Sequence, residues 1–132
     1  MNRYLLDTNH ASAVFKKQLN LPAHPKFTAS DEFGIALPSI GELWFMVFNS
    51  ARIQQNTQRL DEVLQDWRRW ALDDQAVYEF GRIKAEARRT GRGIADVDTQ
   101  IAAIARANGL TLLTDDADFS SVAGLTLDNW LR

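Results

Sequence analysis

The stretch "GIADVDTQIAAIA", residues 93–105, combines the apolar face of a helix with two aspartates. Apolar side chains recur at helical spacing at Val97, Ile101, Ile104 and Ala105, which predicts an amphipathic helix. Asp96 stands where an N-cap is expected, because a carboxylate there accepts hydrogen bonds from free amides of the first turn. Asp98 lies inside that turn, where the helix dipole favours a carboxylate by only a few tenths to about 1 kcal/mol. The second aspartate therefore needs another explanation.

Short apolar runs alternate with helical patterns along the rest of the chain. Strands are expected at residues 3–6, 34–38, 110–114 and 125–131. Helices are expected at 10–19, 39–52, 57–72, 76–91 and in the quoted stretch, which ends at Gly109. In the helix at 76–91, the spacing places Val77, Phe80 and Ile83 on the apolar face. This alternation predicts an α/β fold with a central parallel sheet of four to five strands, flanked by helices on both faces.

Length and composition predict one domain over residues 1–132, since 132 residues with 45% hydrophobic side chains can bury a core. The net charge of -2 gives no overall positive field for a nucleic acid, although a local basic patch can serve. Cysteine is absent, which excludes disulfides and thiolate metal sites and is compatible with a cytoplasmic location. No membrane segment is expected, because the longest apolar run, "LWFMVF" at 43–48, is far shorter than the roughly 20 residues that a bilayer takes. The N-terminal "MNRYLLDTN" does not resemble a signal peptide.

Acidic residues stand at positions that a parallel sheet gathers at one edge. Asp7 ends the first expected strand, Glu42 lies shortly after the second, and Asp98 lies in the helix that leads into the third. A further group, "DDAD" at 115–118, follows the third strand. Because strand carboxyl ends share an edge with the adjoining helix N-termini, we expect these carboxylates to lie close together.

Each acid also has a purely structural interpretation. Asp7 can cap the following helix, Asp96 can cap the quoted one, and "DDAD" can be a solvated turn. Glu42 completes "SIGE", a capping box in which Ser39 is the N-cap. Capping needs only one side chain per helix, however, and converging carboxylates oppose each other's ionisation unless a cation lies between them. Oxygen ligands favour Mg²⁺ or Mn²⁺, whereas zinc is disfavoured because the chain has no cysteine and its two histidines lack zinc-site spacing.

Five segments together resemble the PIN-domain nucleases, and in particular the VapC toxins of bacterial type II toxin–antitoxin pairs. They are "YLLDTN", "SIGEL", "GIADVDTQIAA", "GLTLLTDDADF" and "VAGLTLDNW", which occur in the family's order and cover the chain from end to end. The resemblance implies a PIN-like fold and a metal-dependent endoribonuclease that cleaves RNA, with tRNA and rRNA as candidate substrates, and so inhibits translation and growth. It also implies a cognate VapB-type antitoxin that neutralises the enzyme, and a homodimer that joins this antitoxin in a hetero-oligomer.

The resemblance assigns roles to individual acids. Asp7 matches the aspartate of the family's first strand, and Glu42 matches the glutamate of its S-x-x-E-L helix. Asp98 matches the aspartate three residues before "IAA". Asp96 matches a variable position, so it keeps the capping role.

The fourth acidic position falls in "TDDADF", and the sequence leaves its identity open among three aspartates. Asp116 fits best, because it lies two residues after Thr114, where the family has Asn or Asp. Asp118 matches the acid of the family's D/E-F pair and is a plausible helper, while Asp115 is assigned to the surface. Hydrogen bonds that orient the carboxylates are expected from Thr8, Asn9 and Thr114.

These ligands predict metal-assisted hydrolysis of a phosphodiester. One or two Mg²⁺ ions held by Asp7, Asp98 and Asp116 are expected to bind a phosphate oxygen, lower the pKa of a bound water and stabilise the leaving oxygen. Glu42 is expected to complete the metal site through water or to orient the nucleophile. Phosphate contacts are expected from arginines that lead into the acidic helix, although such arginines more often form a solvated face. They are Arg88, Arg89 and Arg92.

The apolar run at 43–48 suggests a partner surface. Six consecutive apolar residues of a helix point in every direction, so one core cannot easily bury them all. Part of this run, with Trp44 or Phe48, is therefore expected to contact a second subunit or the antitoxin. The alternative is a helix buried between the sheet and the next helices.

Two other functions are compatible with carboxylates at a sheet edge. A receiver-like signalling module also gathers carboxylates and Mg²⁺ there, but it requires adjacent acids after the first strand and a lysine near the last one. The first strand here is followed by "DTN", and no lysine follows Lys84. A catalytically inactive PIN scaffold is the second alternative, although every expected acid is present.

Overall fold

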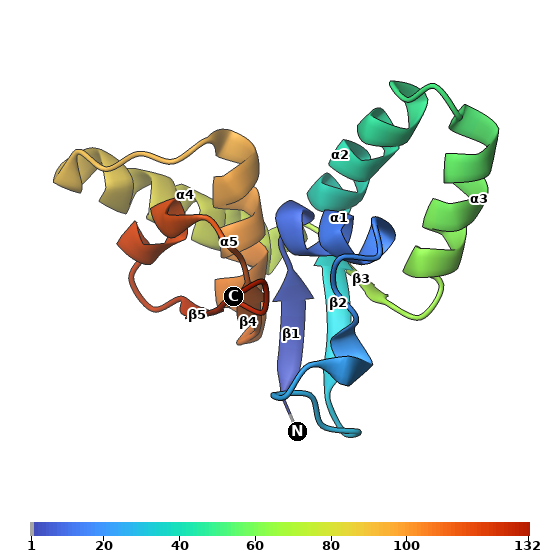
Figure 1. Ribbon diagram of the computed structural model, residues 1–132. Coiled ribbons are helices and arrows are strands. Elements are labelled where there is room, and N and C mark those ends of the chain that lie inside the picture. Colours follow the sequence, from blue (N-terminus) through green and yellow to red (C-terminus); the bar gives the residue numbers. More distant parts are fainter. Residues whose placement is uncertain (1) are drawn as a thin grey trace.

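The computed structural model describes residues 2–132 and contains a parallel sheet of five strands (Figure 1). The strands are β1 (Arg3–Leu6), β2 (Glu32–Ala36), β3 (Arg68–Trp70), β4 (Thr111–Leu113) and β5 (Thr126–Asp128). The helices are α1 (Thr8–Phe15), α2 (Leu37–Phe48), α3 (Ile53–Leu64), α4 (Asp74–Thr90) and α5 (Asp96–Asn108), with short 3₁₀ helices η1 (Leu21–Ala23) and η2 (Ala117–Ser121). The spatial order is β3-β2-β1-β4-β5, and every neighbouring pair is parallel. The predicted α/β fold is confirmed.

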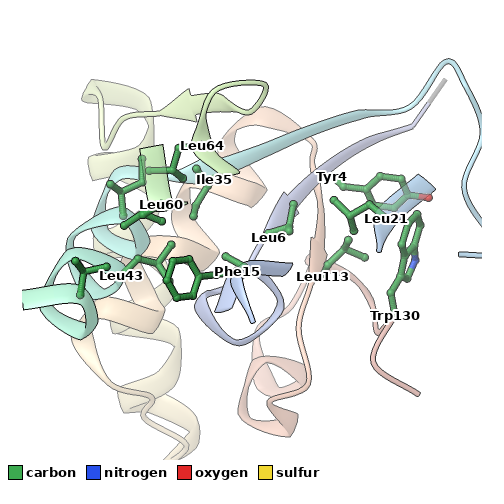
Figure 2. Packing of buried hydrophobic residues seen from close by; sticks show 13 residues of the cluster. Tyr4, Leu6, Phe15, Leu21, Ile35, Leu43, Leu60, Leu64, Leu113 and Trp130 are labelled. Carbon is green, nitrogen blue, oxygen red and sulfur yellow. The ribbon is translucent and has the colours of Figure 1, made fainter. Parts of the chain in front are cut away.

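Successive residues of the strands enter two separate apolar cores, one on each face of the sheet. Leu6 and Ile35 belong to the core formed with α1, α2 and α3, which Figure 2 shows. The adjacent Leu5 and Ala36 belong to the core formed with α4 and α5. Successive side chains of a pleated strand point to opposite faces, so β1, β2 and β4 each contribute to both cores. Helices thus cover both faces of the sheet, as the sequence predicted.

The carboxyl ends of β1 and β2 meet the starts of α1 and α2 at one edge of the sheet (Figure 1). β1 lies at the centre, between β2 and β4. Its carboxyl end is therefore flanked by the segments that follow β2 and β4. This edge is the one at which the sequence predicts the acidic residues.

Two glycines end the long helices of the second half, as the sequence predicted. Gly91 follows α4 with φ of 70°, and Gly109 follows α5 with φ of 63°. Residues other than glycine rarely adopt this left-handed backbone conformation, which ends the helix and changes the direction of the chain. These glycines therefore set the residues at which α4 and α5 end. Among residues 2–132, the two helices pack against each other more extensively than any other pair of elements.

β3 was missed by the sequence analysis, which expected one helix over residues 57–72. The structure ends α3 at Leu64 and pairs Arg68–Trp70 with β2. β3 is an edge strand whose two arginines are exposed, so it lacks the apolar run by which buried strands are recognised. The Arg68 guanidinium lies over the Trp70 ring at 3.8 Å, a contact that replaces burial in a core.

Three other expectations about helices were wrong in detail. α1 starts earlier than the expected 10–19 because Asp7 caps it, and it ends earlier, just before Lys17 adopts a left-handed φ of 59°. α2 ends at Phe48 and does not continue to residue 52. On α4, Val77 is 51% exposed, and the buried positions are Ala76 and Ile83. Within residues 2–132, no helix combines the length and the apolar character that crossing a bilayer requires.

Candidate active site

Asp7 occupies the end of the central strand and has two functions in the local structure. Its Oδ1 accepts a hydrogen bond of 2.7 Å from the Thr8 amide, which makes Asp7 the N-cap of α1. Its Oδ2 accepts a hydrogen bond of 2.8 Å from the Thr114 hydroxyl, across from β1 to the end of β4. Only 5% of the residue is exposed, and burial raises the pKa of its carboxyl despite these hydrogen bonds. The capping interpretation is therefore correct, and Glu42 and Asp116 are close enough that their charges also raise the pKa of the same carboxyl.

Asp98 lies where the carboxylates converge. Burial first, and repulsion from four other carboxylates second, together raise the pKa of its carboxyl to about 6. Those carboxylates are, in decreasing order of effect, Asp7, Asp116, Glu42 and Asp118. We call Asp98 and these four residues the carboxylate cluster. The structure thus brings together acids that are spread from residue 7 to residue 118 of the sequence.

Glu42 belongs to the cluster and does not form the capping box that "SIGE" suggested. α2 begins at Leu37, after an N-cap at Ala36 that makes no side-chain hydrogen bond, so Ser39 lies inside the first turn. Pro38 in that first turn presets the helical backbone, which explains the earlier start. Glu42 is exposed at the sheet edge, and its Oε1 accepts a hydrogen bond of 2.6 Å from the Thr8 hydroxyl.

Asp96 does not cap α5, which corrects the prediction for the first of the two aspartates. The N-cap is Ala95, without a side-chain hydrogen bond, and Asp96 is the first helical residue. Its side chain is 67% exposed and accepts a hydrogen bond of 3.2 Å from the Lys84 ammonium of α4. Two residues along the helix, Asp98 points to the sheet edge, since a shift of two residues turns the side chain to nearly the opposite side of a helix.

The acids after β4 occupy three different environments. The Asp116 amide donates to the Thr114 hydroxyl at 3.0 Å, and its Oδ1 caps η2 by accepting from the Asp118 amide at 2.9 Å. Asp116 acts on the pKa values of both Asp7 and Asp98, whereas Asp118 acts on that of Asp98. Asp115 is exposed, and its Oδ1 accepts from the Asn129 amide group at 2.7 Å. The geometry therefore favours Asp116 as the fourth acid.

Two of the three predicted orienting residues contact a carboxylate, and the third contacts a histidine. Thr8 donates to Glu42, and Thr114 donates to Asp7. The Asn9 side-chain oxygen instead lies 2.9 Å from Nδ1 of His10. His10 is fully buried, and its Nε2 accepts a hydrogen bond of 3.0 Å from the Trp130 amide. The sequence analysis considered His10 only as a zinc ligand, and a lone histidine on an apolar helix face gave no signal for this role.

The donor set of the cluster fits a hard divalent cation. It consists of carboxylate oxygens, and none of the ion pairs found among residues 2–132 involves a member of it. The pKa of Asp98 is raised by burial first and by repulsion from the other carboxylates of the cluster second. In the described part of the chain, however, no three such side chains are already arranged as a ligand set for a metal ion. Holding an ion would therefore require the carboxylates to rearrange.

A cavity adjoins the cluster on the β5 side. It has a volume of about 600 Å³, and Thr114, Asp116 and Asn129 are among the residues that line it. A larger cavity of about 880 Å³, lined by residues such as Phe33 and Trp67, includes no member of the cluster. The chemistry of the acids, rather than cavity size, identifies the candidate site.

The three arginines proposed to contact phosphate lie at the end of α4 and just beyond it. Arg88 and Arg89 occupy the last turn of α4, and Arg92 follows Gly91 in the connection to α5. All three side chains are exposed. This connection leads to the N-terminal end of α5, close to which Asp98 lies (Figure 1).

The match to a known family agrees with the fold and with the acidic edge. A profile of the PIN domain matches residues 4–125 of the chain. The chain therefore belongs to the PIN-domain family, and the receiver-like alternative is wrong.

Relatives that match nearly the whole chain assign it to one group within the PIN-domain family. Ribonuclease VapC2 of Haemophilus influenzae is 30% identical, and the match covers 99% of this chain and 100% of the relative. The tRNA(fMet)-specific endonuclease VapC of Shigella flexneri is 28% identical, with 98% and 99% covered. The crystal structure of VapBC2 from Rickettsia felis, bound to a DNA fragment from their promoter, superposes with a TM-score of 0.86 at 25% identity, with 97% and 98% covered. Within the PIN-domain family, the chain is a member of the VapC group.

Proposed function

We propose that this protein is a Mg²⁺-dependent endoribonuclease, the toxin of a VapBC pair, and that it inhibits translation and growth by cutting RNA. The observation that carries the proposal is the convergence of Asp7, Glu42, Asp98 and Asp116 at one sheet edge, with the pKa of Asp98 raised to about 6. A site that accumulates uncompensated negative charge is suited to a divalent cation and to the phosphate that the cation attracts. Relatives named as ribonucleases support RNA as the substrate.

The residues of the cluster have different proposed roles in phosphodiester hydrolysis. Asp7, Asp98 and Asp116 are the proposed ligands of Mg²⁺, with Mn²⁺ as a substitute. When bound, the cation supplies positive charge that stabilises the transition state and makes water more acidic. Glu42, fixed by the Thr8 hydroxyl, is placed to accept a proton from the attacking water or to orient it. Asp118 adds negative charge near Asp98 and supports the site from η2.

A cleavage assay tests this proposal directly. The purified chain is incubated with end-labelled total tRNA and rRNA, with Mg²⁺, with Mn²⁺, or with a chelator. We expect discrete fragments with either metal and none with the chelator. Intact RNA under every condition, with a protein that Mg²⁺ nevertheless stabilises, would assign the chain to the inactive-scaffold alternative.

The arginines at the end of α4 are proposed to bind the RNA backbone and not to act in the chemical step. Replacing Arg88, Arg89 and Arg92 together by Ala should raise KM severalfold and leave kcat nearly unchanged. The slope of log KM against log salt concentration should fall by about 2, since each lost phosphate contact on single-stranded RNA contributes about 0.7. An unchanged slope would assign these residues to the solvated surface.

The outer face of α2 is the proposed contact surface for the VapB-type antitoxin or for a second copy of the chain. Leu43 and Val47 are buried, but Phe45 is 71% exposed and Phe48 is 62% exposed. Trp44 stacks on Phe48 with ring centroids 5.7 Å apart. Of the two residues that the sequence analysis named for this surface, Phe48 is exposed, whereas Trp44 is half-buried against the core, and Phe45 was not named. Adjacent exposed aromatic rings are typical of interfaces.

Substitutions on this face should weaken antitoxin binding. The double change Phe45→Ser and Phe48→Ser is expected to raise the Kd at least about thirtyfold, equal to about 2 kcal/mol for a pair of aromatic contacts. Binding is measured by calorimetry with the antitoxin encoded beside this gene, and self-association by sedimentation. Tyr78→Ser, on an equally exposed aromatic of α4, is the matched control. Unchanged affinity and unchanged self-association would exclude α2 from both interfaces.

A further inference from the structure

The chain after β5 returns to the loop that carries Asp116. The Thr114 amide donates to the Asp128 carbonyl at 3.0 Å, and the Asn129 amide group donates to Asp115 Oδ1 at 2.7 Å. One residue later, the Trp130 ring is buried in the core beside Tyr4, with centroids 5.0 Å apart, as Figure 2 shows. The loop from Thr114 to Asp116 is therefore held from the side of the C-terminal segment as well as by β4.

His10 of α1 anchors this C-terminal segment. The Trp130 amide donates to His10 Nε2 at 3.0 Å, so this nitrogen is unprotonated. The proton then resides on Nδ1, which donates to the Asn9 side-chain oxygen at 2.9 Å. The ring is fully buried, and both of its nitrogens have partners. A leucine at this position would fill the space but leave the Trp130 amide without an acceptor, at the cost of a buried unsatisfied donor.

These contacts close a ring that begins and ends at Asp7. On the short side, Thr114 donates to Asp7 and accepts from the Asp116 amide. On the long side, α1 runs from its cap at Asp7 to His10, and the contacts continue through Trp130 and Asn129 to the loop of Asp116. Two of the proposed metal ligands are thus connected by two independent routes.

We propose that His10 and Asn129 are positioning residues, which fix the loop 114–116 against α1 and thereby set the spacing between Asp7 and Asp116. The proposal rests on the proposed metal site. A loop that follows a strand of only three residues has few other restraints on the proposed ligand that it carries. Residues that orient metal ligands without touching the metal contribute about 10–100-fold to metal affinity. His10 and Asn129 act through the protein and touch neither metal nor RNA.

Metal titrations of five variants test this role. His10→Leu and Asn129→Ala should each raise the Mg²⁺ concentration for half-maximal thermal stabilisation about tenfold, while KM for RNA stays the same. The double variant should raise this Mg²⁺ concentration only slightly more than the stronger of the two single variants does, because both changes break the same closed set of contacts. His10→Gln, whose side-chain oxygen can accept from the Trp130 amide, should recover most of the affinity. Asn108→Ala is the control, since it removes an asparagine side-chain hydrogen bond at the opposite end of α5 from Asp98, whereas Asn129→Ala removes the bonds to Asp115 and from the Leu131 amide.

The outcomes separate this proposal from the proposed function. Both His10→Leu and Asn129→Ala could lower the melting temperature and leave the Mg²⁺ concentration for half-saturation unchanged. This result would show that His10 only packs in the core, and it would overturn the proposal. A wild type that Mg²⁺ stabilises but that cleaves no RNA would refute the ribonuclease function, while the titrations would still decide the positioning role. A wild type that neither Mg²⁺ nor Mn²⁺ stabilises would overturn the positioning role together with the metal site.

Discussion

Asp98→Asn is expected to lower the rate of RNA cleavage at least about a thousandfold, equal to about 4 kcal/mol of lost transition-state stabilisation. The amide keeps the shape of the side chain but removes the charge that attracts the cation. Cleavage of an end-labelled RNA at saturating Mg²⁺ measures the loss, and growth after induced expression measures toxicity. Both should disappear together.

The same substitution should leave the fold intact and even stabilise the metal-free protein. The raised pKa of Asp98, about 6 against an ordinary 3.8, means that its ionised form is disfavoured in the folded state. Its contribution to stability is therefore complete in acid and is lost as the pH rises through about 6. At neutral pH, Asn removes this penalty, about 1–2 kcal/mol after allowance for solvent screening of a partly exposed group. Thermal melting without metal should give a variant at least as stable as the wild type.

Asp96→Asn is the matched control, because it makes the same chemical change two residues earlier on the same helix. Since Asp96 is exposed and pairs only with Lys84, activity should be retained and the free energy of unfolding should change by less than about 0.5 kcal/mol. Mg²⁺ should raise the melting temperature of the wild type and of Asp96→Asn but hardly that of Asp98→Asn. An inactive Asp96→Asn beside an active Asp98→Asn would transfer the metal site to Asp96.

The second large effect is a loss of stability in acid that depends on His10. Burial lowers the pKa of His10 from 6.5 to about 4, against the opposing influence of Asp115 and Asp128 and with a small contribution from His24. Between pH 6.5 and about 4, His10 is therefore protonated in the unfolded chain but not in the folded one. The free energy of unfolding falls as the pH drops through this range. The shift corresponds to about 3 kcal/mol, a substantial part of the total stability of about 5–15 kcal/mol that is typical of a protein.

Denaturant unfolding at several pH values measures this effect best in an Asp98→Asn background. Asp98 titrates in the same range with the opposite sign, so its removal takes away one contribution that opposes that of the histidine. The further change His10→Gln should abolish the His10-dependent part of the slope, because Gln does not titrate. Parallel curves for the two proteins over this range would show that His10 is not the group responsible.

The convergence of acids could be predicted from the sequence because it depends only on the parallel sheet. Once Arg3–Leu6 and Thr111–Leu113 are strands in one parallel sheet, Asp7 and Asp116 follow at the same edge whatever the details of packing. Glu42 and Asp98 belong to helices that begin at that edge. The family motifs supplied the same acids independently.

The parts that the sequence did not predict depend on tertiary contacts. Lys84 of α4 gives Asp96 a partner that no local pattern contains, and Ala95 caps α5 only through its backbone conformation. β3 is polar and short, so its strand conformation follows from pairing with β2 and not from its own composition. The contact of His10 with Trp130 joins residues 120 positions apart and has no local signature.

The central place of β1 has a consequence for the timing of synthesis. Asp7 and Glu42 leave the ribosome early with β1 and β2, whereas Asp98 and Asp116 lie on segments that follow α4. The ladder between β1 and β4, with Leu6 opposite Leu113, forms only after those later segments have emerged. At about 5–20 residues per second, the interval between Glu42 and Asp116 lasts several seconds. A nascent chain therefore lacks two of the four acids of the proposed cation site until its last segments have emerged, and Trp130 reaches His10 later still.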